Sequence, residues 1–397
     1  EIARKGGLKA TLEIDHGGEK LYAALELGFA DGLQMRITEP TLALDLTVKN
    51  GSAYFALGDI KLTGTASDLP AALTAFKDAI PEQLNSLIET ITSLTNGIVS
   101  ANSLRSIAET AINAIAELSV TDGVMFVRIN ADGVNATLRA PLGLESATAE
   151  ITLGGSVVTA RLNAITASAV QIAAPVGSYV QAKDLIAAAA PFAHVAVGEA
   201  VEIGINAEVY DVPVTGTAYM CFGGANVAGI GAEINVFVGD LPVIITVQNS
   251  TVFIKIGSHV CLSEQLNEQS IMALVDKLDH AIAGLQETVQ KIIDGIKSMT
   301  VRKLISSLAL APVENGFEFT ADLTPSGLDL CAKVRMITVG GALSSVQIDC
   351  NMLGIAATMD FDAVLTDGKL DALVATSATV GSVPMALSLA PTAAEVK

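Results

Sequence analysis

Tryptophan is absent from this 397-residue chain, and phenylalanine and tyrosine bring its aromatic content to only 4%. Basic residues are also scarce, with 23 Lys plus Arg against 42 Asp plus Glu and a formal net charge of -19. Such a chain lacks the broad positive field that nucleic acids and anionic membrane surfaces attract. We therefore expect no nucleic-acid partner and weak binding to anionic membranes.

The residues and motifs of common catalytic centres are also few. The four His have no metal-site spacing, the four Cys form no CxxC, and the GxSxG, P-loop and GxGxxG motifs are missing. Asp360 and Asp362 are the best pair for an acid-base or calcium role, because alternate strand residues share a face. An outward polar row on a strand would have the same pattern. We expect no catalytic residues, no metal and no cofactor.

One cysteine pair, Cys331 and Cys350, stands on either side of Gly340-Gly341. A two-residue turn there would set the two cysteines opposite each other, within reach of a disulfide. In that register, the apolar faces of the two strands would lie on opposite sides of the sheet. The register of a strand pair follows its buried face. We predict a shifted turn and free thiols.

Long uncharged runs occupy residues 162–182 and 212–232, but proline and repeated glycine interrupt them. They are interpreted as buried strands, so no transmembrane segment is predicted. Because the chain opens with Glu1, we expect a mature form or a fragment, with any signal peptide outside it. A mean hydropathy of +0.52 without a spanning helix favours an extracytoplasmic protein, secreted or in the cell envelope.

An internal repeat organises the chain. Residues 47–58 and 246–257 match at an offset of 199, and both are typical of a hairpin. Each hairpin precedes about 50 residues of helical periodicity. Alternating strands then resume, near Gly123 in the first copy and Gly316 in the second.

The first copy begins with five predicted strands, at residues 8–15, 20–28, 32–38, 42–49 and 53–61. Two helices with apolar stripes follow, at residues 84–94 and 104–118, and residues 271–296 carry the matching stripe of the second copy. An alanine-rich stretch at residues 181–190 links the copies. The predicted domains are therefore residues 1–178 and 179–397, each a half-barrel repeat.

The predicted fold class is α+β: two tandem repeats, each a curved antiparallel sheet, or half-barrel, with a helical hairpin packed on one face. The meanders ending at residues 47–62 and 246–262, each running into helices and then strands, carry a fold-level resemblance to the LolA-like lipoprotein-carrier superfamily. That resemblance implies an apolar cavity for acyl chains between helices and sheet, in a bacterial envelope protein. Tubular lipid-binding proteins are a second fold-level resemblance.

Two functions follow as hypotheses. The first is a non-catalytic extracytoplasmic protein that binds a lipid or another apolar small molecule between the helices and the curved sheet. The second is a cell-surface structural or adhesive module with a packed core and no ligand. The sequence does not identify a protein partner. The candidate ligand-lining residues of the first hypothesis are Leu87, Ile91, Leu94, Phe126, Leu278, Leu285, Val289, Ile292 and Phe319.

Overall fold

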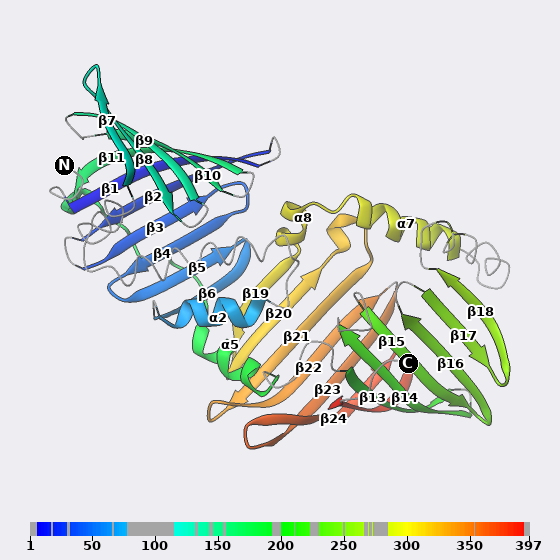
Figure 1. Cartoon of the computed structure of the whole chain (residues 1–397). Helices are drawn as coiled ribbons and strands as arrows, with labels where there is room; N and C mark the ends of the chain where they lie inside the picture. The colour runs from blue at the N-terminus through cyan, green and yellow to red at the C-terminus, as the bar shows by residue number, and fades with distance from the viewer. Residues whose placement is uncertain are drawn as a thin grey trace. The chain divides into compact units, whose positions relative to one another are not determined.

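The computed structural model describes residues 6–16, 19–29, 32–65, 67–77, 115–131, 134–142, 146–153, 156–192, 200–209, 211–222, 230–248, 251–265, 269, 272, 285–352 and 354–392. The chain divides into two compact units. Unit 1 comprises residues Glu1–Lys183 and Ala309–Ala311, and unit 2 comprises Asp184–Leu308 and Pro312–Lys397. Strands dominate the described part of both units (Figure 1).

Unit 1 is built on a wide open sheet. Its elements are β1 (Gly6–His16), β2 (Glu19–Gly28), β3 (Gln34–Glu39), β4 (Leu44–Lys49), β5 (Ser52–Leu57), β6 (Asp59–Thr65), α2 (Asp68–Lys77), β7 (Ile115–Thr121), β8 (Val124–Ala131), β9 (Val134–Pro141), β10 (Ser146–Leu153), β11 (Ser156–Thr166), η1 (Ala167–Ala169) and β12 (Val180–Gln181). The strands pair antiparallel in the order β7-β8-β9-β10-β11-β1-β2-β3-β4-β5-β6. On the free edge of β6, residues 180–181 and residues 309–310 pair in parallel with it, so the sheet is mixed there.

Unit 2 has the same connectivity among its described strands, with one more strand after the helices. Its elements are α5 (Ala182–Ala189, from Asp184 on), η2 (Ala190–Phe192), β13 (Ala200–Val209), β14 (Val212–Phe222), β15 (Ile230–Val238), β16 (Leu241–Gln248), β17 (Thr251–Ile256), β18 (His259–Gln265), α7 (Leu285–Lys297), α8 (Val301–Ser306), the ends of β19 (Leu308–Val313), β20 (Gly316–Asp322), η3 (Thr324–Ser326), β21 (Leu330–Val339), β22 (Ala342–Met352), β23 (Ile355–Thr366), β24 (Lys369–Val380) and β25 (Val383–Thr392). They pair antiparallel in the order β18-β17-β16-β15-β14-β13-β25-β24-β23-β22-β21-β20. In each unit a six-strand meander comes first, and a strand from the end of the unit pairs with its first strand.

The predicted fold class is wrong, because wide, mixed, unclosed sheet takes the place of two half-barrels each carrying a helical hairpin. The described helix of unit 1, α2, has ten residues and is about 15 Å long. Ten strand spacings make the sheet beside it about 48 Å wide. One helix of that length covers only β5 and β6, which it contacts. In addition, Ile115 and Leu118, expected on a helix, lie on strand β7.

The core of unit 1 lies on one face of β3 to β6. Alternate residues on this face are buried, and Leu46, Phe55 and Leu62 stand opposite one another on successive strands. The helix α2 adds Leu69 and Leu73, which are 0% and 1% exposed. Figure 1 shows α2 beside β6. This part of the unit is fully packed, as an amphipathic sheet under an amphipathic helix requires.

The two cysteines are free thiols, as predicted, but for a different reason from the predicted turn shift. The turn stays at Gly340 and Gly341, with Val339 opposite Ala342. A β-bulge between Ile337 and Thr338 then moves the register by one residue, so that Ala332 faces Cys350. The bulge returns both apolar faces to the same side of the sheet, which separates the cysteines.

Candidate functional site

The predicted ligand-lining residues are distributed over both units. Leu87, Ile91, Leu94 and Leu278 lie outside the described residues. In unit 2, Leu285, Val289 and Ile292 lie on α7, and Phe319 lies on β20 opposite Val334.

Phe126 is in unit 1, on β8, and the guanidinium carbon of Arg139 lies 4.7 Å from the centre of its ring. The ring is therefore next to a cation rather than inside an apolar cavity. This set of residues stays a prediction. The two hollows described below are lined by other residues.

A continuous row of side chains crosses eight strands of unit 1. Residues directly opposite each other in antiparallel strands share a face, and each member of the row is paired with the next. In order from β8 to β4, the row contains Phe126, Arg139, Thr148, Arg161, Thr11, Ala24, Thr38 and Asp45. Two hollows are lined by members of this row, one by its arginines and one by the residues from Thr11 onward.

The larger hollow is an open groove of about 590 Å³ over β1 to β4. Its lining is mostly apolar, although Glu39 and Asp45 belong to it. The lining residues are Thr11, Leu12, Tyr22, Ala23, Ala24, Thr38, Glu39, Pro40, Ala43, Leu44 and Asp45. Small residues in the middle of the groove, such as Ala24, leave the space that larger side chains would fill. We call this hollow the apolar groove.

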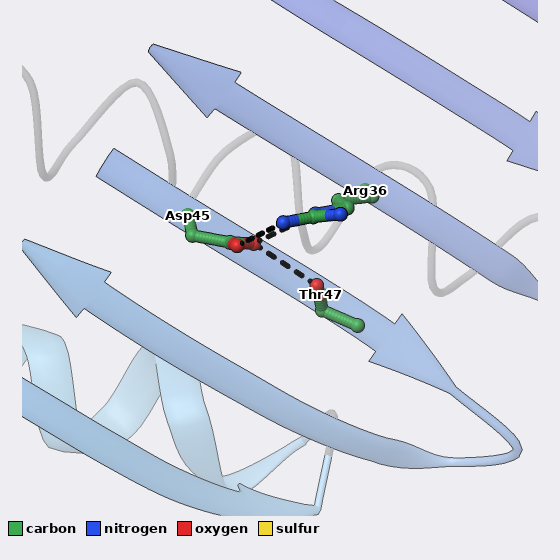
Figure 2. A network of polar contacts seen from close by, with 3 residues as sticks. All are labelled: Arg36, Asp45 and Thr47. Carbon is green, nitrogen blue, oxygen red and sulfur yellow. Dashed lines mark hydrogen bonds and ion pairs between the residues drawn. The ribbon is translucent and has the colours of Figure 1, made fainter. Parts of the chain in front are cut away.

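The Asp45 carboxylate of the apolar groove is neutralised within the sheet (Figure 2). It accepts hydrogen bonds from Arg36 Nη2 at 2.7 Å and Nε at 3.3 Å, and from the hydroxyl of Thr47 at 3.0 Å. The hydrogen bond to Asp45 raises the pKa of Arg36 above its ordinary value. Thr47 is fully buried, which fixes one side of this network.

The Glu39 carboxylate is satisfied by the backbone. It is 4% exposed and accepts the N–H groups of Thr41 at 2.9 Å and Leu42 at 2.6 Å. It thereby holds the turn between β3 and β4 that forms the end of the groove. Neither carboxylate of the apolar groove is left without a partner, which lowers the cost of placing an apolar group against it.

The smaller hollow is polar, with a volume of about 250 Å³ over β9 to β11. Two arginines, two hydroxyls and an amide surround it. Its lining residues are Arg139, Pro141, Ser146, Ala147, Thr148, Arg161, Leu162 and Asn163. We call this hollow the arginine hollow.

The carboxylate pair of Asp360 and Asp362 lies on β23 of unit 2, opposite Gln347 and Ser345 of β22. Asp360 belongs to a polar row that runs from β20 to β23. This row includes the ion pair between Arg335 and Glu318, whose hydrogen bond raises the pKa of Arg335. Within the described ranges, no three His, Cys, Asp or Glu side chains converge on a point where a metal ion could bind.

The helices give one further finding. Among those that the structure describes, none combines the length and apolar character needed to cross a membrane.

Comparison with known proteins gives no family. No family model matches the chain, and no curated protein matches it. The solved structure of MucB in complex with MucA(peri) is similar at 9% identity, covering 98% of this chain and 88% of that one, with a TM-score of 0.25. A Helicobacter pylori beta clamp in complex with 5-chloroisatin (8% identity, 82% and 98% coverage) and Pseudomonas aeruginosa OccK3 (8% identity, 97% and 93% coverage) have TM-scores of 0.10 and 0.08. At such TM-scores these likenesses carry no weight for fold or function, which therefore rest on the chain's own geometry.

Proposed function

We propose that the protein is a non-catalytic binding protein that holds an apolar ligand, such as a lipid or acyl chain, in the apolar groove of unit 1. The observation that carries the proposal is this groove itself: about 590 Å³ of open space with a mostly apolar lining and two satisfied carboxylates. Pockets for small molecules are mostly apolar and have volumes of about 300–1,000 Å³. The volume of the groove is in that range.

The proposal assigns no reaction to the groove. Its two carboxylates are the acid-base groups at hand, and both are engaged in hydrogen bonds that hold the fold. A general base needs a lone pair aimed at its substrate and a pKa near the working pH. The carboxylate oxygens of Asp45 are instead occupied by hydrogen bonds from Arg36 and Thr47.

The extracytoplasmic location predicted from the sequence is kept as part of the proposal. An apolar ligand crosses an aqueous compartment only when a protein covers it, because exposed apolar surface is costly in water. Fractionation of producing cells, with detection of the protein in the envelope or medium, tests this part.

The test of the groove is a pair of matched alanine substitutions on one face of the sheet. Ala24 lines the groove, and Ala56 lies outside its lining, on β5 opposite Asp45. Ala24→Leu fills the groove, whereas Ala56→Leu makes the same change three strands further along the sheet. The chain has no Trp, so the neutral fluorescent probe N-phenyl-1-naphthylamine reports binding without interference.

We expect the wild type and Ala56→Leu to bind the probe equally, and Ala24→Leu to bind at least about tenfold more weakly, a loss of about 1.4 kcal/mol. Circular dichroism checks that all three chains are folded. Equal binding by the two variants, or no binding by the wild type, would refute the proposal. The second result would favour the alternative of a structural or adhesive module, for which the filled core under β3 to β6 is the supporting observation.

A further inference from the structure

Two arginines of unit 1 stand out because their charges have no carboxylate partner. Four cationic strand side chains of the unit form ion pairs: Lys9 with Glu26, Arg36 with Asp45, Lys61 with Asp59 and Arg128 with Glu117. Lys49 donates to the carbonyl oxygen of Ile172 at 2.6 Å. Among the strand residues whose side chains the structure describes in this unit, Arg139 and Arg161 have neither kind of partner, and both line the arginine hollow.

The absence of an acidic partner is notable because the chain has 42 acidic residues and a net charge of -19. Two guanidinium groups that line one hollow repel each other, and an acidic chain offers ample carboxylates to relieve that repulsion. The polar residues that line the hollow together with the two arginines are Ser146, Thr148 and Asn163, whose neutral side chains can donate hydrogen bonds. A lining of this kind combines hydrogen-bond donors with positive charge, which is the chemistry of an anion site.

One of the two arginines is also partly ordered. The guanidinium of Arg139 is held over the ring of Phe126 at 4.7 Å, so less side-chain freedom remains to be lost when an anion binds. A planar guanidinium can donate two parallel hydrogen bonds to a carboxylate or phosphate.

The arginine hollow and the apolar groove are neighbours on the same row. Arg161 lines the hollow, Thr11 lines the groove, and the two residues are directly opposite each other on β11 and β1. Adjacent strands are about 4.8 Å apart, which places Ala24 of the groove about 10 Å from the strand of Arg161. One elongated molecule can therefore occupy both hollows.

We propose that the ligand of the apolar groove is an anionic amphiphile whose headgroup, a carboxylate or a phosphate, binds between Arg139 and Arg161. This inference rests on the proposed function and names its ligand class. The overall acidic charge still disfavours a whole anionic membrane surface, so the site selects single molecules whose one headgroup reaches the two arginines.

The test compares three twelve-carbon amphiphiles on the full chain, below their micelle-forming concentrations, by displacement of N-phenyl-1-naphthylamine. Laurate has a carboxylate, dodecyl phosphate has a phosphate, and dodecanol is neutral. The variant carries Arg139→Gln and Arg161→Gln. The matched control is Arg128→Gln, which removes an exposed strand arginine that is paired with Glu117 and lies outside the hollow.

We expect at least one of the two anionic amphiphiles to bind at least about tenfold more tightly than dodecanol, as a charge-assisted hydrogen bond would provide. The tighter of the two identifies the headgroup. The double variant should lose this preference and keep its affinity for dodecanol, whereas Arg128→Gln should keep both. Raising NaCl from about 50 mM to about 500 mM should narrow the preference, because salt screens exposed charges.

Equal binding of all three amphiphiles by the wild type would overturn this inference and leave the proposed function standing. The inference is overturned in the same way if Arg128→Gln lowers the preference as much as the double variant does. Failure of every amphiphile and of the probe to bind would overturn the proposed function and this inference together.

Discussion

The packing of Phe55 gives a quantitative test of how unit 1 is held together. Its side chain is 2% exposed and lies between Leu46 and Leu62, which are both 0% exposed. Burying a phenylalanine contributes about 1.5–3 kcal/mol. Hydrogen bonds to β4 and β6 hold β5 from both sides, so the cavity left by Phe55→Ala can collapse only slightly. The free energy of unfolding of unit 1 should therefore fall by about 3–5 kcal/mol, as is usual when a buried phenylalanine is replaced by alanine.

Hydrogen exchange followed by mass spectrometry measures this change separately in each unit. In peptides from β4, β5 and β6, the free energy of the openings that allow exchange should fall by about 3–5 kcal/mol. Peptides from β20 to β24 should keep their protection. Phe253→Ala is the matched control, because Phe253 is 43% exposed on β17 and its removal should change stability by less than about 0.5 kcal/mol. A loss below about 1 kcal/mol for Phe55→Ala, or an equal loss of protection in both units, would refute the packing described for β3 to β6.

Two further predictions concern local packing and charge. A Cβ added at Gly64 would lie 2.9 Å from the Cβ of Ala182, so Gly64→Ala should lower the free energy of unfolding by about 1–3 kcal/mol. Ala182→Gly in the same chain should recover part of this loss, which urea denaturation of both single variants and the double variant measures. Strictly additive losses of stability would argue against the contact. In α7, the hydrogen bond from Lys291 holds the pKa of Glu287 below its ordinary value of 4.5, so this pair stabilises the helix above that pH and the effect is lost as the pH falls further. Backbone amide shifts of α7 followed by NMR from pH 6 to pH 3 should show the loss in the wild type and not in Lys291→Ala, and identical titrations would contradict the assignment.

The strands of unit 1 are largely predictable from the sequence, because alternation of apolar and polar residues directly reports a sheet with one buried face. The predicted hairpin at residues 47–58 is present, with Asn50 and Gly51 at positive φ in its turn. The single strand predicted at residues 53–61 is in fact two, β5 and β6, separated by Gly58 at a φ of 61°. A lone glycine inside an apolar run gives a weak signal, and only the pairing of Leu57 with Ile60 reveals the turn.

The candidate site cannot be predicted from sequence periodicity. The apolar groove depends on which small residues end up beside each other, and its lining combines Ala24 of β2 with Pro40 and Ala43 of the turn after β3. The arginine hollow has the same origin, since Arg139 and Arg161 become neighbours only through the pairing of β9, β10 and β11. One signal is available in the sequence: in a chain with few basic residues, each strand arginine without an acidic residue at the paired position is worth attention.

The central claim is that the apolar groove binds an amphiphile, and native mass spectrometry of the full chain tests it most directly. The wild type, Ala24→Leu and Ala56→Leu would each be equilibrated with laurate and, separately, with dodecyl phosphate under the same conditions. For at least one of the two amphiphiles, we predict one bound equivalent in the wild type and in Ala56→Leu, and little or none in Ala24→Leu. A wild-type chain that binds neither amphiphile, or an Ala24→Leu chain that binds as much as the wild type, would contradict the account.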